Sequence, residues 1–283
     1  MKEKVIIAGD KKNLIGILCE AKKEGFGTQK PSVLLLNAGL VHRIGPFRMN
    51  VDLSRELSEL GYDVLRVDIS GIGDSDKIAN DSRSYEQRNL DDIGEFVKYL
   101  SSNNPQGVVV IGLCTGADHS HKAAVAYKEV VGTILFDGYG YPTFKFYLKR
   151  YGPILLSFNR TINAIKKVFK ALFRIGGKSS GDASGADAYF WKLPPKSNYI
   201  NDLELLRERG VKQFYVYTSG VDGYYNYKEQ FADGFGSKDY SRDITVEYYD
   251  RSDHTYSLHN DRMRMFKDVT NWLLTNFGGS QES

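Results

Sequence analysis

The sequence of 283 residues lacks the features of a membrane or secreted protein. It holds only two cysteines, Cys19 and Cys114, and oxidising compartments favour denser disulfide frameworks. No apolar run approaches the roughly 18 residues that cross a bilayer. The first seven residues carry charge and no apolar stretch of signal-peptide length. We therefore expect a cytoplasmic protein with no transmembrane segment, in which a reduced thiol persists.

Strong charge of either sign is also lacking. The net charge is +3 and is spread along the chain, so we predict no nucleic-acid partner. The sequence has no HExxH, no CxxC and no carboxylate cluster at ligand spacing, and we predict no metal and no cofactor. The glycines of the turn at 68–75 (DISGIGDS) are spaced wrongly for a dinucleotide or P-loop site, which favours a structural turn.

Short strand-type runs alternate with longer helix-type segments. This alternation predicts an α/β fold with a mostly parallel sheet and helices on both faces. The expected strands are 5–8, 14–19, 32–36, 62–67, 107–112, 131–136, 213–217 and 244–249. The expected helices are 49–60, 84–100, one from 115, 225–232 and 260–277.

One segment, 141–205, differs in composition and is predicted to be a cap or lid inserted between core segments 1–140 and 206–283. From Tyr141 to Lys178 it carries nine Lys or Arg and no Asp or Glu. Apolar residues recur every three or four positions from Ile154 to Leu172, which indicates an amphipathic helix. This helix either roofs an acyl pocket and offers its basic face to an acyl carrier protein, membrane surface or polyanion, or packs as a plain cap with a solvated basic face.

The most informative motif is Gly112-Leu113-Cys114-Thr115-Gly116, which follows a buried apolar strand and precedes a helix. This is the nucleophile-elbow pattern G-x-S-x-G with cysteine at its centre. The flanking glycines avoid collisions at a strained turn, and the sulfur lies at a helix N-terminus that favours a thiolate. The alternative is a small buried cysteine on an ordinary strand-to-helix turn.

With this motif the chain resembles the α/β-hydrolase superfamily over nearly its whole length. The runs 37–46 (NAGLVHRIGP), 112–117 (GLCTGA) and 137–139 (DGY) resemble bacterial hydrolases associated with exosortase and exopolysaccharide gene clusters. The superfamily includes members with a cysteine nucleophile, such as the dienelactone hydrolases. The resemblance implies an α/β-hydrolase fold with an inserted cap and a catalytic triad in the order nucleophile, acid, histidine.

The chain offers that order. His254 follows the last expected strand, where the superfamily carries its general base, although a histidine in such a loop is commonly structural or exposed. Asp222, after the strand 213–217, is the favoured acid because a carboxylate there fixes the imidazole tautomer. Asp137, at the end of the preceding strand, is the rival, and Asp253 lies too close in sequence to orient the ring.

The resemblance implies an oxyanion hole made of two backbone N–H groups. One belongs to Thr115 and the other to Leu40, after Gly39 in the loop that follows the strand 32–36. The superfamily often has His-Gly at this loop, where this chain has Ala-Gly. The candidate substrate-binding residues are Gly39, His42, Arg43 and Asp137. Arg43 suits a carboxylate or phosphate, and the alternative is that it pairs with surface acids.

Three functions follow from these residues. The first is an acyl-enzyme hydrolase, a thioesterase or esterase that uses a Cys114–His254–Asp222 triad on a small-molecule or carrier-bound acyl group. The second is an acyltransferase that uses the same triad on a thioester donor. The third is a non-catalytic binding protein that keeps the fold and has a degenerate site.

Overall fold

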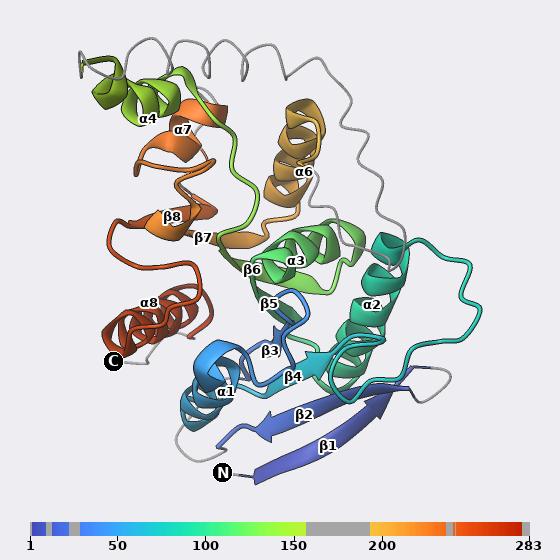
Figure 1. The fold of residues 1–283 in the computed structure, drawn as a ribbon. Coiled ribbons are helices and arrows are strands. Elements are labelled where there is room, and N and C mark those ends of the chain that lie inside the picture. The colour runs from blue at the N-terminus through green and yellow to red at the C-terminus, as the bar shows by residue number, and fades with distance from the viewer. Residues whose placement is uncertain are drawn as a thin grey trace.

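An eight-stranded sheet forms the centre of the computed structural model, which describes residues 2–9, 13–22, 29–156, 193–235, 240 and 242–278 (Figure 1). Its strands are β1 (Lys2–Ala8), β2 (Leu14–Glu20), β3 (Ser32–Leu35), β4 (Val64–Asp68), β5 (Val108–Leu113), β6 (Val130–Phe136), β7 (Lys212–Thr218) and β8 (Ile244–Tyr249). Their spatial order is β1-β2-β4-β3-β5-β6-β7-β8. The pairs β1–β2 and β2–β4 are antiparallel and the others are parallel, which confirms the predicted class.

Helices cover both faces of the sheet, with α1 and α8 on one side and α2 and α3 on the other (Figure 1). They are α1 (Met49–Glu59), α2 (Tyr85–Asn103), α3 (Thr115–Ala126), α4 (Phe144–Leu156), α6 (Lys196–Glu208), α7 (Gln230–Phe235) and α8 (His259–Phe277), with the short 3-10 turns η1 (Pro46–Arg48) and η3 (Ser219–Val221). None of them, within the described ranges, has the length and apolar character that a membrane span requires.

The central strands are buried on both faces because helices sandwich them. Every residue of β3 and of β5 is buried, as the unbroken apolar runs of their sequences predict. Parallel strands end at the same edge of a sheet, so the residues that follow β3, β5 and β6 are brought together there.

Helix α6 bears on the predicted division into core and cap. The boundary between 205 and 206 falls inside this helix, and Tyr199 and Leu203, both 0% exposed, pack in one apolar cluster with Leu135 and Tyr215 of the sheet. The predicted amphipathic helix extends into residues 157–192, outside the described residues. The cap assignment of 141–205 therefore stays a prediction.

Arg209, just past α6, ties this helix to the end of α3. Its Nη1 donates to the carbonyl of Ala124 at 2.5 Å, and its Nη2 donates to that of Tyr127 at 2.9 Å. The last carbonyls of a helix have no partner within the helix, so a cation there satisfies them and complements the helix dipole.

Replacing Arg209 by alanine should therefore lower the free energy of unfolding by about 1.5–3 kcal/mol, because charged hydrogen bonds to helix-end carbonyls are lost. Urea denaturation measures this. Arg207→Ala is the matched control: its ion pair with Glu204 lies on the exposed surface, so no measurable change is expected. Equal losses in the two variants contradict the capping role.

Candidate active site

Cys114 lies on the turn between β5 and α3 in a strained conformation, with φ 59° and ψ −122°. A Cβ on Gly112 would lie 2.0 Å from the carbonyl oxygen of Gly116, and one on Gly116 would lie 2.5 Å from that of Asn37. Both contacts are far shorter than atoms tolerate, so glycine is required on each side. The local geometry is that of the elbow expected from the sequence, and strain of this kind collects at functional sites.

His254 approaches the sulfur from the loop between β8 and α8. Its Nδ1 lies 2.8 Å from Oδ2 of Asp137, which leaves Nε2 as the ring nitrogen available to Cys114. The hydrogen bond with Asp137, followed by that with Cys114, raises the pKa of His254 from 6.5 to about 10, although burial acts in the opposite direction. The imidazole is therefore protonated at neutral pH.

Asp137 is held firmly in place at the end of β6. Its carboxylate is fully buried and accepts two hydrogen bonds of 2.7 Å from Thr218, one from the backbone N–H and one from the hydroxyl. Its carbonyl accepts from the hydroxyl of Tyr224 at 2.8 Å. Its φ of 52° is unusual for a residue other than glycine. These contacts fix the carboxylate against the ring of His254.

The preference for Asp222 as the partner of His254 is thereby corrected. The Asp222 carboxylate is 74% exposed and lies 3.6 Å from the Arg150 guanidinium. The turn η3 brings the backbone close to the histidine loop, since a Cβ on Gly220 would lie 2.2 Å from the backbone nitrogen of His254. That turn leaves the Asp222 side chain facing solvent, whereas Asp137, the rival, contacts the ring.

The loop after β3 reaches the start of α3. The Gly39 N–H donates to Oγ1 of Thr115 at 2.8 Å, and the Val41 N–H donates to the Ala38 carbonyl at 3.0 Å, which closes a turn. Gly39 has φ 57°, and a Cβ there would meet nothing within 4 Å, so backbone conformation alone favours glycine. Leu40, 82% exposed, is at the tip of the turn.

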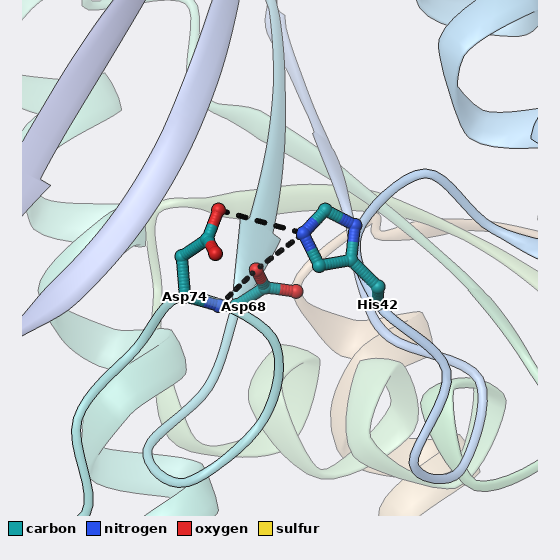
Figure 2. A group of neighbouring side chains, drawn as sticks. All are labelled: His42, Asp68 and Asp74. Atoms are coloured by element: carbon teal, nitrogen blue, oxygen red, sulfur yellow. Dashed lines mark hydrogen bonds and ion pairs between the residues drawn. The ribbon is translucent and has the colours of Figure 1, made fainter.

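His42, from this loop, lies beside Asp68 and Asp74, which end and follow β4 (Figure 2). Their potential ligand atoms lie within 4.8 Å of one another, as at a metal site. The Arg43 guanidinium, however, donates to both carboxylates and to Nε2 of His42. A cation would have to displace it, so these residues fit an ion-pair network. Arg43 thus pairs with acids, the alternative to binding a substrate anion.

Thr218 and Tyr224 were missed by sequence reasoning, although they fix Asp137. Thr218 ends the strand that pairs with β6, so its place beside the end of β6 could have been inferred from the strand order. Tyr224 carries no such signal. Among the described residues, the cavity beneath the elbow measures only about 10 Å³. A larger hollow of about 850 Å³ lies elsewhere, between the 78–83 loop and α2.

Comparisons with known proteins agree with this architecture. No protein-family model and no curated protein sequence matches the chain. A Pyrococcus furiosus esterase aligns over 98% of this chain and 92% of its own, with 16% identity and a TM-score of 0.58. A Xanthomonas campestris α/β serine hydrolase without a lid aligns over 99% and 97%, with 11% identity and a TM-score of 0.56.

A third solved structure is the mouse alpha/beta hydrolase domain-containing protein 10, which aligns over 98% of this chain and all of its own. The identity is 15% and the TM-score 0.53. Identities this low establish the fold and not the activity. The chain has the α/β-hydrolase fold.

The charge on His254 can be tested directly by following its ring nitrogens by NMR as the pH rises. Because the folded pKa is raised, the imidazolium should persist at pH 8 and be lost only as the pH approaches about 10. Asp137→Asn should bring the midpoint toward the ordinary value of about 6.5. His254→Gln identifies the signal among the five histidines.

Asp222→Asn is the control in the same titration and should leave the midpoint of His254 unchanged. A wild-type midpoint near 6.5, or a midpoint that depends on Asp222 and not on Asp137, contradicts the assigned contact.

Proposed function

We propose that the chain is an acyl-enzyme hydrolase, a thioesterase or esterase, with Cys114 as nucleophile, His254 as acid and base, and Asp137 as the residue that orients His254. The observation that carries the proposal is the 2.8 Å contact between Asp137 and Nδ1 of His254, combined with the strained turn that holds Cys114. Nucleophile, base and orienting carboxylate are the three parts that covalent acyl transfer requires.

In the first half-reaction the sulfur of Cys114 attacks the carbonyl carbon of an ester or thioester. A protonated His254 beside it favours the thiolate that attacks. The electrons of the carbonyl move onto its oxygen, and the N–H groups of Thr115 and Leu40 stabilise that charge. When the bond to the leaving group breaks, His254 gives its proton to the departing oxygen or sulfur, and the acyl group stays on Cys114 as a thioester.

In the second half-reaction water replaces the leaving group. His254, now neutral, takes a proton from the water as its oxygen attacks the thioester carbon. The carbon–sulfur bond then breaks, the acid leaves and the pair of thiolate and imidazolium is restored. Asp137 keeps Nδ1 protonated through both steps, so that Nε2 always faces the reacting atoms.

That the acyl group is delivered by an acyl carrier protein stays a prediction. Three of the nine basic residues of the inserted segment, Lys145, Lys149 and Arg150, lie on α4. Lys145 pairs with Glu229, Lys149 lies over the ring of Tyr227, and Arg150 pairs with Asp222. Their charge is directed to this chain's own side chains. The narrower likeness to exosortase-associated hydrolases likewise stays a prediction.

Intact mass spectrometry after mixing with p-nitrophenyl esters and short acyl thioesters should reveal one acyl group on Cys114. His254→Gln and Asp137→Asn should each slow its formation by about 10²-fold or more, because proton transfer and ring orientation are lost. Asp222→Asn is the matched carboxylate control and should stay within about twofold of wild type. An adduct that forms equally fast without His254 contradicts the mechanism.

Acyl transfer by the same residues is separated by adding an alcohol or amine acceptor and identifying the product. Free acid as the main product supports hydrolysis, and the ester or amide of the acceptor supports transfer. A wild-type chain that forms no adduct, and whose Cys114 reacts with iodoacetamide like a free thiol, points to the non-catalytic binding protein.

A further inference from the structure

The loop of residues 38–43, here called the oxyanion loop, carries the proposed N–H donor of Leu40 but has little apolar anchoring at its tip. Leu40 is 82% exposed and Val41 is 39% exposed. An oxyanion donor must be held within about 0.5 Å of its productive position to be effective. Hydrophobic packing does not hold this tip, so polar contacts at the two ends of the loop must do so.

Asn37 fixes the first end. Its amide nitrogen donates to the Val41 carbonyl and to Oδ1 of Asp68, both at 2.9 Å. Its amide oxygen accepts from the backbone N–H of Ile69 at 3.0 Å. One side chain thereby joins the end of β3, the closing residue of the turn and the end of β4.

Arg43 fixes the second end. Its backbone N–H donates to Oδ1 of Asp68 at 2.7 Å. Its guanidinium donates to Oδ2 of Asp68 and, at 2.6 Å, to Asp74. Asp68 is fully buried and the Arg43 side chain is only 11% exposed. Figure 2 shows the two carboxylates converging on His42, whose Nε2 accepts from Arg43 at 2.8 Å.

The turn after β4 is shaped around the same carboxylate. Gly73 has φ 57°, and a Cβ there would lie 2.1 Å from Oδ2 of Asp68. The backbone N–H of Asp74 also donates to that oxygen, at 3.1 Å. The turn at 68–75 therefore wraps a buried carboxylate, and the partner of that carboxylate is on the oxyanion loop.

We propose that Arg43, Asp68 and Asp74 form a brace that positions the Leu40 N–H as an oxyanion donor, so that Arg43 is a positioning residue that does not touch the substrate. This role rests on the proposed function. Moving Arg43 away from Asp68 would leave the buried carboxylate with an uncompensated charge, which is strongly unfavourable. The ion pair therefore holds the loop in one arrangement. The brace thus supplies the rigidity that packing does not give the loop.

The test compares two reactions of Cys114 in Arg43→Ala and wild type. Acylation by a p-nitrophenyl ester develops an oxyanion, whereas alkylation by iodoacetamide develops none at a carbonyl. Removing one oxyanion donor costs about 10²–10³-fold in rate. We therefore expect Arg43→Ala to slow acylation by about 10–10²-fold at nearly unchanged KM, with alkylation within about twofold of wild type.

Two further variants refine the comparison. Arg43→Lys keeps the charge and loses the planar fork, so it should recover part of the acylation rate. Arg83→Ala is the matched control, because Arg83 also bridges two aspartates, Asp81 and Asp91, but does so next to α2. It should leave both reactions unchanged.

Amide hydrogen exchange of the peptide covering 37–44 supplies a readout that needs no activity. Exchange there should quicken in Arg43→Ala and stay as in wild type in Arg83→Ala. Unchanged exchange overturns the brace, and so does a parallel loss of acylation and alkylation, which indicates general support of the fold. A wild-type chain that is never acylated overturns the proposed function and, with it, the catalytic role of the brace. Amide hydrogen exchange then decides only whether the brace orders the loop.

Discussion

The hydrogen bond between Asp137 and His254 is the contact on which the proposed chemistry of this molecule depends. It joins the end of β6 to the loop after β8 and fixes one nitrogen of the ring so that the other faces Cys114. It also holds a positive charge beside a sulfur that already lies at a helix N-terminus. Without it His254 would be an ordinary histidine in a surface loop, one-third exposed and free to rotate.

Half of the positive-φ residues other than glycine in the described part of the chain lie around this contact. Among the described residues other than glycine, φ is positive at Phe47, Arg48, Asn80, Cys114, Asp137 and Tyr256. Cys114 and Asp137 are the proposed nucleophile and the proposed partner of His254, and Tyr256 is two residues after His254. Such conformations cost of order 1–3 kcal/mol each and persist only where the surroundings enforce them. The rigid sheet below, with β3 and β5 buried on both faces, provides that enforcement.

Much of the fold could be predicted from local pattern. The apolar runs at 32–36 and 107–112 lie within about one residue of β3 and β5, because strands buried on both faces tolerate little else. The elbow could also be predicted from the sequence, because a side chain at either glycine flanking Cys114 would collide with neighbouring backbone. Helix α6 was not predicted as an element: Tyr199, Leu203 and Leu206 have helical spacing, but polar residues separate them and the preceding segment has a cap-like composition.

The aspartate that contacts His254 could not be chosen from sequence, and the reason is geometric. Asp137 and Asp222 both follow strands of the same sheet, β6 and β7, which are neighbours. Their difference arises from a positive φ at one and a 3-10 turn before the other, neither of which leaves a local signature. The pairing of Arg43 with Asp68, 25 positions apart, likewise exists only once β3 and β4 lie side by side.

The most direct measurement is a crystal structure of the chain with an aldehyde bound to Cys114 as a thiohemiacetal, which mimics the tetrahedral intermediate. The account predicts that the hemiacetal oxygen lies within hydrogen-bond distance of the Thr115 and Leu40 N–H groups, with His254 still bonded to Asp137. An adduct whose oxygen points away from both N–H groups, or a His254 ring that has left Asp137, would contradict it.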